Sequence, residues 1–136
     1  MHEHEKWLMI AQEDLKAAQF LLTGEFFATV VYHCQQSAEK ALKGFLSAQN
    51  QEICKTHDLV KLVELCSLFD ATFKKLFVSA QYLKPFATKF RYPTEYDLID
   101  RNEAELAIKH AAAIMKFVLK KLEEPSSGQS IIFEFE

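Results

Sequence analysis

The chain has 136 residues, a hydrophobic fraction of 49% and a formal net charge of −3. This size and composition indicate one globular domain and exclude global disorder. The negative net charge also excludes nucleic-acid binding by bulk electrostatic attraction, so any contact with RNA or a nucleotide has to be local.

Glycine and proline occur only three times each, which is too few turn residues for an all-β fold and favours long helices. The three cysteines, Cys34, Cys54 and Cys66, are an odd number without metal-ligand spacing. We therefore expect reduced thiols in a cytoplasmic protein. The charged N-terminus is unlike a signal peptide, and there is no apolar run of the roughly 18 residues that a membrane-spanning helix needs.

Two helices are predicted in the first third of the chain. Residues 3–23 carry a helical apolar stripe, made of Leu8, Ala11, Leu15, Ala18 and Leu22. Gly24 is expected to end this helix in the left-handed conformation that glycine adopts readily. A second helix is predicted at 25–49, and so short a connection makes the pair an antiparallel hairpin. Inside it, Gly44 indicates either a close helix approach or a tolerated cost of ~1 kcal/mol relative to alanine.

Two shorter helices are predicted next. A polar loop at 50–55 precedes a helix that Thr56 or Asp58 can cap, because both side chains accept hydrogen bonds from a first helical turn. A fourth helix is predicted at 71–84. Pro85 is expected to end or kink it, since proline lacks the backbone N–H that a helix requires.

The last predicted helix has a capping-box start. It follows a predicted loop at 86–99, begins after Asp100 and extends to about residue 123. Glu103, three residues beyond Asp100, can bond back to the backbone of the capping residue.

The chain thus divides into a helical bundle, residues 1–124, and a linker with a C-terminal tail, residues 125–136. In the tail, Phe133 and Phe135 alternate with glutamates at the period of a strand. Such a segment could pair with another copy or another protein, and a frayed terminus is the alternative.

The predicted second helix combines its apolar face with dense polar residues. One stripe holds His33, Gln36, Lys40 and Lys43, and an adjacent one holds Tyr32, Gln35, Gln36, Glu39 and Lys43. Neutral donors and acceptors beside two cations suit a phosphate and a base. From the spacing alone, a solvated helix face with a Gln36–Lys40 pair is the alternative.

Two further residues have side chains suited to phosphate chemistry. His57 could act as an acid or base near neutral pH, or it could be a structural residue at a helix start. Arg91 offers the flat donor fork that matches phosphate, or it could pair with Glu95 or Asp97. The chain has no Gly-rich phosphate loop and no Cys/His zinc pattern, so neither a metal nor a cofactor is expected.

Four segments carry a family resemblance when they are taken together. They are Asp14-Leu15 with Ala18, residues 35–43, Thr56-His57-Asp58-Leu59 and Arg91-Tyr92-Pro93. In this order they resemble the HEPN domain family of prokaryotes over roughly residues 3–123. The resemblance implies an all-α, up-down bundle of four to five helices, often a homodimer and often encoded beside a small nucleotidyltransferase partner. Such pairs act as toxin and antitoxin, many HEPN toxins are metal-independent endoribonucleases, and the family name records a proposed nucleotide-binding role.

One departure from the family bears on activity. In the ribonuclease branch an arginine and a histidine are separated by four to six intervening residues. The corresponding positions are Tyr96, Asp97 and Leu98 beyond Arg91, and Leu106, Ala107 and Ile108 beyond Arg101. Because neither set holds histidine, the ribonuclease activity is not carried over. The residues that the resemblance assigns to a shared pocket or partner surface are Gln36, Glu39, Lys40, Lys43, His57, Arg91 and Tyr92.

Three hypotheses follow from the sequence. The first is a nucleotide- or RNA-binding module that acts with a nucleotidyltransferase partner. The second is a divergent endoribonuclease in which Arg91 contacts the scissile phosphate and His57 is the base. The third is a structural protein that assembles through its helical faces and the tail at 131–136.

Overall fold

The computed structural model describes residues 1–52, 54–88 and 99–124, and the predicted site residues Arg91 and Tyr92 lie outside them. The predicted tail at 125–136 also lies outside the described residues. Within the described part all regular elements are helical, which confirms the all-α prediction. The elements are α1 (Glu3–Thr23), α2 (Phe27–Ala48), α3 (Leu59–Ser67), η1 (Ala71–Leu76), α4 (Phe77–Leu83), η2 (Lys84–Ala87) and α6 (Arg101–Glu123).

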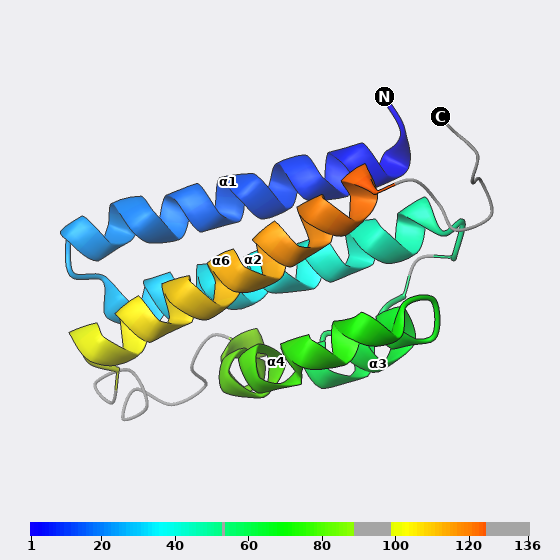
Figure 1. Cartoon of the computed structure of the whole chain (residues 1–136). Helices are drawn as coiled ribbons and strands as arrows, with labels where there is room; N and C mark the ends of the chain where they lie inside the picture. Colours follow the sequence, from blue (N-terminus) through cyan, green and yellow to red (C-terminus); the bar gives the residue numbers. More distant parts are fainter. Residues whose placement is uncertain (53, 89–98, 125–136) are drawn as a thin grey trace.

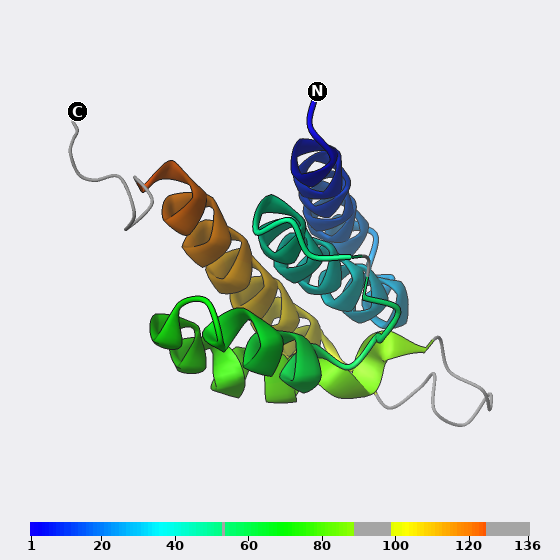
Figure 2. The ribbon, with the colours of Figure 1, turned by 90° about the vertical axis from the view of Figure 1, so that its right-hand side faces the viewer.

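The three long helices lie alongside one another, and the short helices form a row across them (Figures 1 and 2). Helix α2 contacts α1, α6 and α3, so it lies at the centre of the bundle. Its buried side chains follow the predicted apolar stripe, and they join those of the other helices in one core. None of the described helices is long and apolar enough to span a membrane.

The turn between α1 and α2 differs from the prediction. Gly24 ends α1, but its φ is −89°, and the positive φ of 65° falls on Glu25 instead. The expected left-handed glycine is therefore wrong. A Cβ atom at residue 24 would lie 2.6 Å from the ring of Phe26, so a larger residue at this position would require that half-exposed ring to move.

At Gly44, side chains of α1 pack closely against the backbone of α2. A Cβ atom at this position would lie 3.2 Å from Cδ2 of Leu8 and 3.3 Å from Cβ of Trp7. Of the two alternatives left open by the sequence, the structure supports the close helix approach. This contact fixes Trp7 beside the C-terminal half of α2.

Two side-chain caps confirm the predicted helix starts. At α3, Oδ1 of Asp58 accepts hydrogen bonds from the backbone N–H groups of Val60 (2.9 Å) and Lys61 (3.3 Å). At α6, Asp100 accepts from the N–H of Glu103, and Glu103 accepts from the N–H of Asp100. These caps satisfy N–H groups that have no partner within a helix. The α3 cap also places His57, the preceding residue, against α2.

The predicted single helix at 71–84 is wrong, because the segment is divided into η1 and α4. Phe73, which is fully buried, packs between Phe45 and Phe117, with ring centroids 4.3 and 4.9 Å away. A 3₁₀ turn brings residues three apart onto one side, which places Phe73 and Leu76 together in the core. The expected break at Pro85 is confirmed, since α4 ends at Leu83.

Candidate functional site

Three polar side chains on α2 are buried at intervals of four residues. They are Gln35, Glu39 and Lys43, which the helical period places on one side of α2. That side faces the segment leading into α3, so the segment covers them and brings His57 to the same place. Buried charged groups are costly unless they are paired, and each of these has a partner.

The carboxylate of Glu39 is the centre of this group. Its oxygens accept hydrogen bonds from Nε2 of Gln35 (3.1 Å), from Nζ of Lys43 (2.9 Å) and from Nδ1 of His57 (3.0 Å). Burial by itself raises the pKa of Glu39, but the hydrogen bonds from Lys43, Gln35 and His57 outweigh it and hold that pKa below the ordinary value. The carboxylate is therefore ionised at neutral pH.

The imidazole of His57 joins the buried carboxylate to solvent. Its side chain is 70% exposed, while that of Glu39 is 3% exposed. A carboxylate only accepts hydrogen bonds, so the neutral ring carries its proton on Nδ1 and leaves Nε2 as a bare acceptor. The amide of Gln35 also donates to the backbone carbonyl of His57 (3.3 Å), which fixes the residue at both its main chain and its ring.

A chain of amide hydrogen bonds extends this group toward α1. Nε2 of Gln36 donates to Oε1 of Gln35 (2.7 Å), and Nζ of Lys40 donates to Oε1 of Gln36 (2.9 Å). Lys40 then faces Asp14 at 3.6 Å, and Asp14 also meets Nδ1 of His33 at 3.0 Å. We call this connected set the polar seam; its members are Asp14, His33, Gln35, Gln36, Glu39, Lys40, Lys43 and His57.

The charges of the polar seam balance. Asp14 and Glu39 offset Lys40 and Lys43, so the seam gains net positive charge only when one of its two histidines is protonated.

Five of the seven predicted site residues lie in the polar seam. They are Gln36, Glu39, Lys40, Lys43 and His57, and the remaining two, Arg91 and Tyr92, fall outside the described residues. The predicted Gln36–Lys40 pair is present, but it belongs to a larger network rather than to an isolated solvated face.

The sequence-based site omitted Gln35, His33 and Asp14, which the polar seam contains. Gln35 lies on one of the predicted stripes, four residues before Glu39, and its complete burial is what distinguishes it. Asp14 belongs to the family-like segments, but only the tertiary fold brings it opposite His33 and Lys40. Spacing within α2 could have suggested Gln35 and His33 but not Asp14.

Other candidates lie elsewhere in the bundle. Nδ1 of His110 is 2.8 Å from the hydroxyl of Ser79, and its ring packs on Tyr82 with centroids 4.7 Å apart. Burial lowers the pKa of His110, which favours the neutral ring of a boundary residue. Arg101 pairs with Glu25 at 3.0 Å, at the end of the bundle where α1 turns into α2. Among the residues that the structure describes, no group of three His, Cys, Asp or Glu side chains could hold a metal ion.

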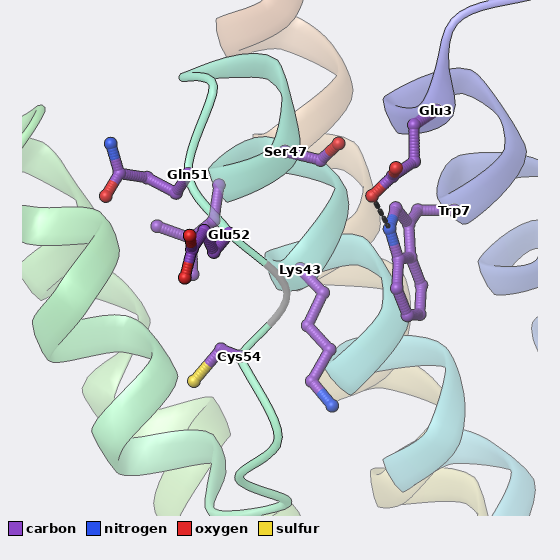
Figure 3. Close-up of a pocket in the computed structure, with 8 residues that line it drawn as sticks. Glu3, Trp7, Lys43, Ser47, Gln51, Glu52 and Cys54 are labelled. Carbon is purple, nitrogen blue, oxygen red and sulfur yellow. Dashed lines mark hydrogen bonds between the residues drawn. The ribbon is translucent and has the colours of Figure 1, made fainter.

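A small pocket adjoins the polar seam, where the start of α1 meets the end of α2 (Figure 3). It is open to solvent, and the space inside it that a water molecule can enter is about 10 Å³, room for about one water. Trp7 and Glu3 form one wall, the segment with Glu52 forms the opposite one, and Lys43 and Ser47 lie between them. Lys43 is thus shared by the pocket and the seam.

Comparisons with known proteins agree with this architecture. A family model described as HEPN domain matches residues 4–122. The crystal structure of TT1696 from Thermus thermophilus is 30% identical in sequence, superposes with a TM-score of 0.79, and is matched over 89% of this chain and 99% of that one. That of ST0689, an archaeal HEPN homologue, is 24% identical with a TM-score of 0.75 over 90% and 100% of the two chains. No curated protein matches this chain in sequence.

Proposed function

The chain belongs to the HEPN domain family, and from this membership we propose that it is a nucleotide- or RNA-binding module that acts with a small nucleotidyltransferase partner in a toxin–antitoxin pair. The single observation that carries the binding part of this proposal is the polar seam. A helix whose role is only structural does not need to bury Gln35, Glu39 and Lys43 and connect them to an exposed imidazole. Apolar residues would fill the same space without the cost of removing charges from water.

The seam suits local recognition of a phosphate. Lys40 remains partly exposed, and His57 is mostly exposed. Lys40 can donate hydrogen bonds to phosphate oxygens, and His57 can do so from Nε2 when its ring carries both protons. Local contacts of this kind are required because the net charge of −3 gives no general attraction for a polyanion.

The partner part of the proposal rests on what the family implies and on the surface of α1. Met9 and Phe20 are exposed on this helix, and Phe26 is exposed in the turn that follows it. Exposed large apolar side chains favour contact with another protein, although such residues are common singly on soluble surfaces.

Thermal unfolding with and without ATP tests the binding proposal. We expect millimolar ATP to raise the melting temperature of the intact chain and the rise to disappear in Lys40→Ala and in Arg91→Ala. Lys16→Ala, which removes an exposed lysine of α1 outside the seam, is the matched control and should keep the shift. An unchanged melting curve with ATP and with a short RNA would contradict the proposal.

The Glu39–His57 pair supports a second candidate function, a divergent metal-independent endoribonuclease. The buried carboxylate orients the ring, and the bare Nε2 faces solvent, as a general base for a ribose 2′-hydroxyl requires. In this alternative Arg91 stabilises the charge that develops on the phosphate.

RNA cleavage in the presence of a chelator tests the enzymatic alternative. Cleavage should be lost in both His57→Ala and Arg91→Ala, and it should fall in Glu39→Gln with a change in its pH profile. Cleavage that is equal in all four proteins would have to come from a contaminating nuclease and would remove this candidate.

A further inference from the structure

The outer side of α6, the yellow to orange helix of Figure 1, carries a row of lysines. Lys109, Lys116 and Lys120 are all exposed, and their spacing of seven and four residues places them on one side of the helix. The sequence from residue 106 to residue 122 contains no aspartate or glutamate. We call these three residues the lysine row.

The other sides of α6 are occupied by contacts within the bundle. Its buried apolar side chains join the common core. Toward the short helices, Phe117 packs on Phe73, with ring centroids 4.9 Å apart, and Lys121 pairs with Asp70 at 3.0 Å. The lysine row therefore lies on the side of α6 that the bundle leaves to solvent.

Contacts within the chain do not account for the lysine row. Among the residues that the structure describes, none of its three ammonium groups has a carboxylate partner, whereas Lys121 has two, Asp70 and Glu124. Cations favour the C-terminal end of a helix, but this effect is confined to the last turn, where Lys120 lies. Acidic residues return only at the two ends of the row, with Glu105 and Glu123.

The 3₁₀ helix η1 adds positive charge beside the second half of α6. The contacts from Phe73 and Asp70 hold η1 against α6, and its last turn carries Lys74 and Lys75. Both lysines are exposed. Asp70 is already paired with Lys121, so it does not offset them. This end of the bundle thus has a local excess of positive charge in a chain whose net charge is −3.

Together these observations lead us to propose that the lysine row, extended by Lys74 and Lys75, binds the phosphate backbone of an RNA strand. At 1.5 Å per residue, the row spans about 16 Å along the helix, so a strand with successive phosphates can contact all of it and a mononucleotide cannot. This inference rests on the RNA-binding part of the proposed function. It places the strand on a surface separate from the polar seam, none of whose members belongs to α6.

The surface between the lysines favours RNA over an acidic protein. Between Lys109 and Lys116, the outer side of α6 carries the small side chains of Ala112 and Ala113. Protein interfaces usually have a core of aromatic or other large apolar side chains, which this stretch does not supply. Contacts to phosphates need only lysine or arginine side chains that can reach them.

Fluorescence anisotropy with a labelled single-stranded RNA of 20 nucleotides tests the lysine row. The triple variant Lys109→Ala, Lys116→Ala and Lys120→Ala should weaken binding by about tenfold or more at 50 mM salt. Each phosphate contact to a single strand contributes about 0.7 to the slope of log affinity against log salt, so the slope should become shallower by about 2. Alanine is the best helix former, so these exposed changes should leave thermal unfolding cooperative.

A second triple variant controls for net charge. Lys6→Ala, Lys16→Ala and Lys61→Ala remove exposed lysines of α1 and α3, and they change the net charge by the same amount. RNA affinity and salt slope should stay close to those of the wild type. Equal weakening by both triple variants would contradict the proposal, because it would assign the effect to overall charge. Polyglutamate that binds more tightly than RNA of equal charge would also overturn it, in favour of an acidic protein.

The outcomes separate this inference from the proposed function. The shift in melting temperature with ATP should persist in the variant that lacks the lysine row. If RNA binds equally well to that variant and to the wild type, the row is wrong and the proposed function stands. If ATP raises the melting temperature but no RNA binds, the row is again wrong and nucleotide binding stands. If neither ATP nor RNA binds, both proposals fail.

Discussion

Nδ1 of the exposed His57 lies 3.0 Å from Oε2 of the buried Glu39. The contact joins the segment before α3 to the middle of α2, and it is closed by Gln35, which bonds to both residues. A single carboxylate therefore orders an imidazole, an amide and an ammonium group. Loss of that carboxylate should affect the fold and the site together.

Removal of either member of the buried ion pair should destabilise the bundle. Glu39→Ala leaves the ammonium of Lys43 buried without its counter-charge, and Lys43→Ala does the reverse. Breaking a buried pair typically costs about 3–5 kcal/mol. Urea unfolding should give a loss of this size for each single variant and a smaller loss than the sum for the double variant. Glu64→Ala on α3 is the exposed control and should change stability by less than about 0.5 kcal/mol.

Acid should weaken the fold partly through the same carboxylate. Because the pKa of Glu39 is lower in the folded chain than its ordinary value, its contribution to stability is present above the unfolded pKa, which is about 4.3 for a glutamate. That contribution is lost as the pH falls through the folded pKa. Unfolding free energy measured from pH 7 downward should therefore fall below about pH 5.

The variant Glu39→Gln shows how much of the stability lost on acidification is due to protonation of Glu39. Asp58 and Asp70 also have lowered pKa values, since the hydrogen bonds and charges around each outweigh its desolvation, so the wild-type curve combines several groups. The glutamine variant should be less stable at pH 7 and should lose less stability on acidification. A variant curve parallel to that of the wild type would show that Glu39 does not contribute to the pH dependence.

Asp58, the N-cap of α3, should stabilise the folded chain more through its hydrogen bonds to the backbone than through its charge. Asp58 accepts from two backbone N–H groups and also faces Lys84 at 3.2 Å, with 39% of the Asp58 side chain and 51% of the Lys84 side chain exposed. Asp58→Ala should lower the unfolding free energy by about 1 kcal/mol, the usual value of an N-cap. Asp58→Asn keeps the cap and removes the ion pair, so it should cost less than about 0.5 kcal/mol, because exposed ion pairs contribute little. Thermal unfolding of the two variants distinguishes these contributions, and equal losses would contradict the assignment.

Local sequence rules were sufficient for the helices whose ends are capped locally. The acceptors at Asp58 and Asp100 lie within three residues of the N–H groups they bind, so the sequence alone specifies the starts of α3 and α6. The prediction of a single helix at 71–84 was wrong because the conformation of this segment depends on residues far away in the sequence. Phe73 fits between Phe45 and Phe117, which belong to α2 and α6, and no local pattern records that requirement.

The sequence allowed most residues of the site to be predicted, but not their burial or their contacts with other segments. Intervals of four along α2 place Gln35, Glu39 and Lys43 on one side, and that much follows from the helical period. Their burial requires the segment at His57 to fold over them, which depends on the loop before α3 and its cap. The link from Lys40 to Asp14 likewise requires the packing of α1 on α2.

The close approach at Gly44 gives the last prediction. Within a helix, Gly→Ala ordinarily stabilises by about 1 kcal/mol, but here the new methyl group would lie 3.2–3.3 Å from Leu8 and Trp7. Overpacking of a tight interface typically costs about 1–3 kcal/mol, so Gly44→Ala should lower stability. Shortening Leu8 relieves the closest of these contacts, so Leu8→Ala should cost less in the Gly44→Ala background than in the wild type. Urea unfolding measures both effects, and a shift in Trp7 emission should accompany the single glycine variant. A stabilised Gly44→Ala protein with unchanged emission would show that α1 has room to move away from α2.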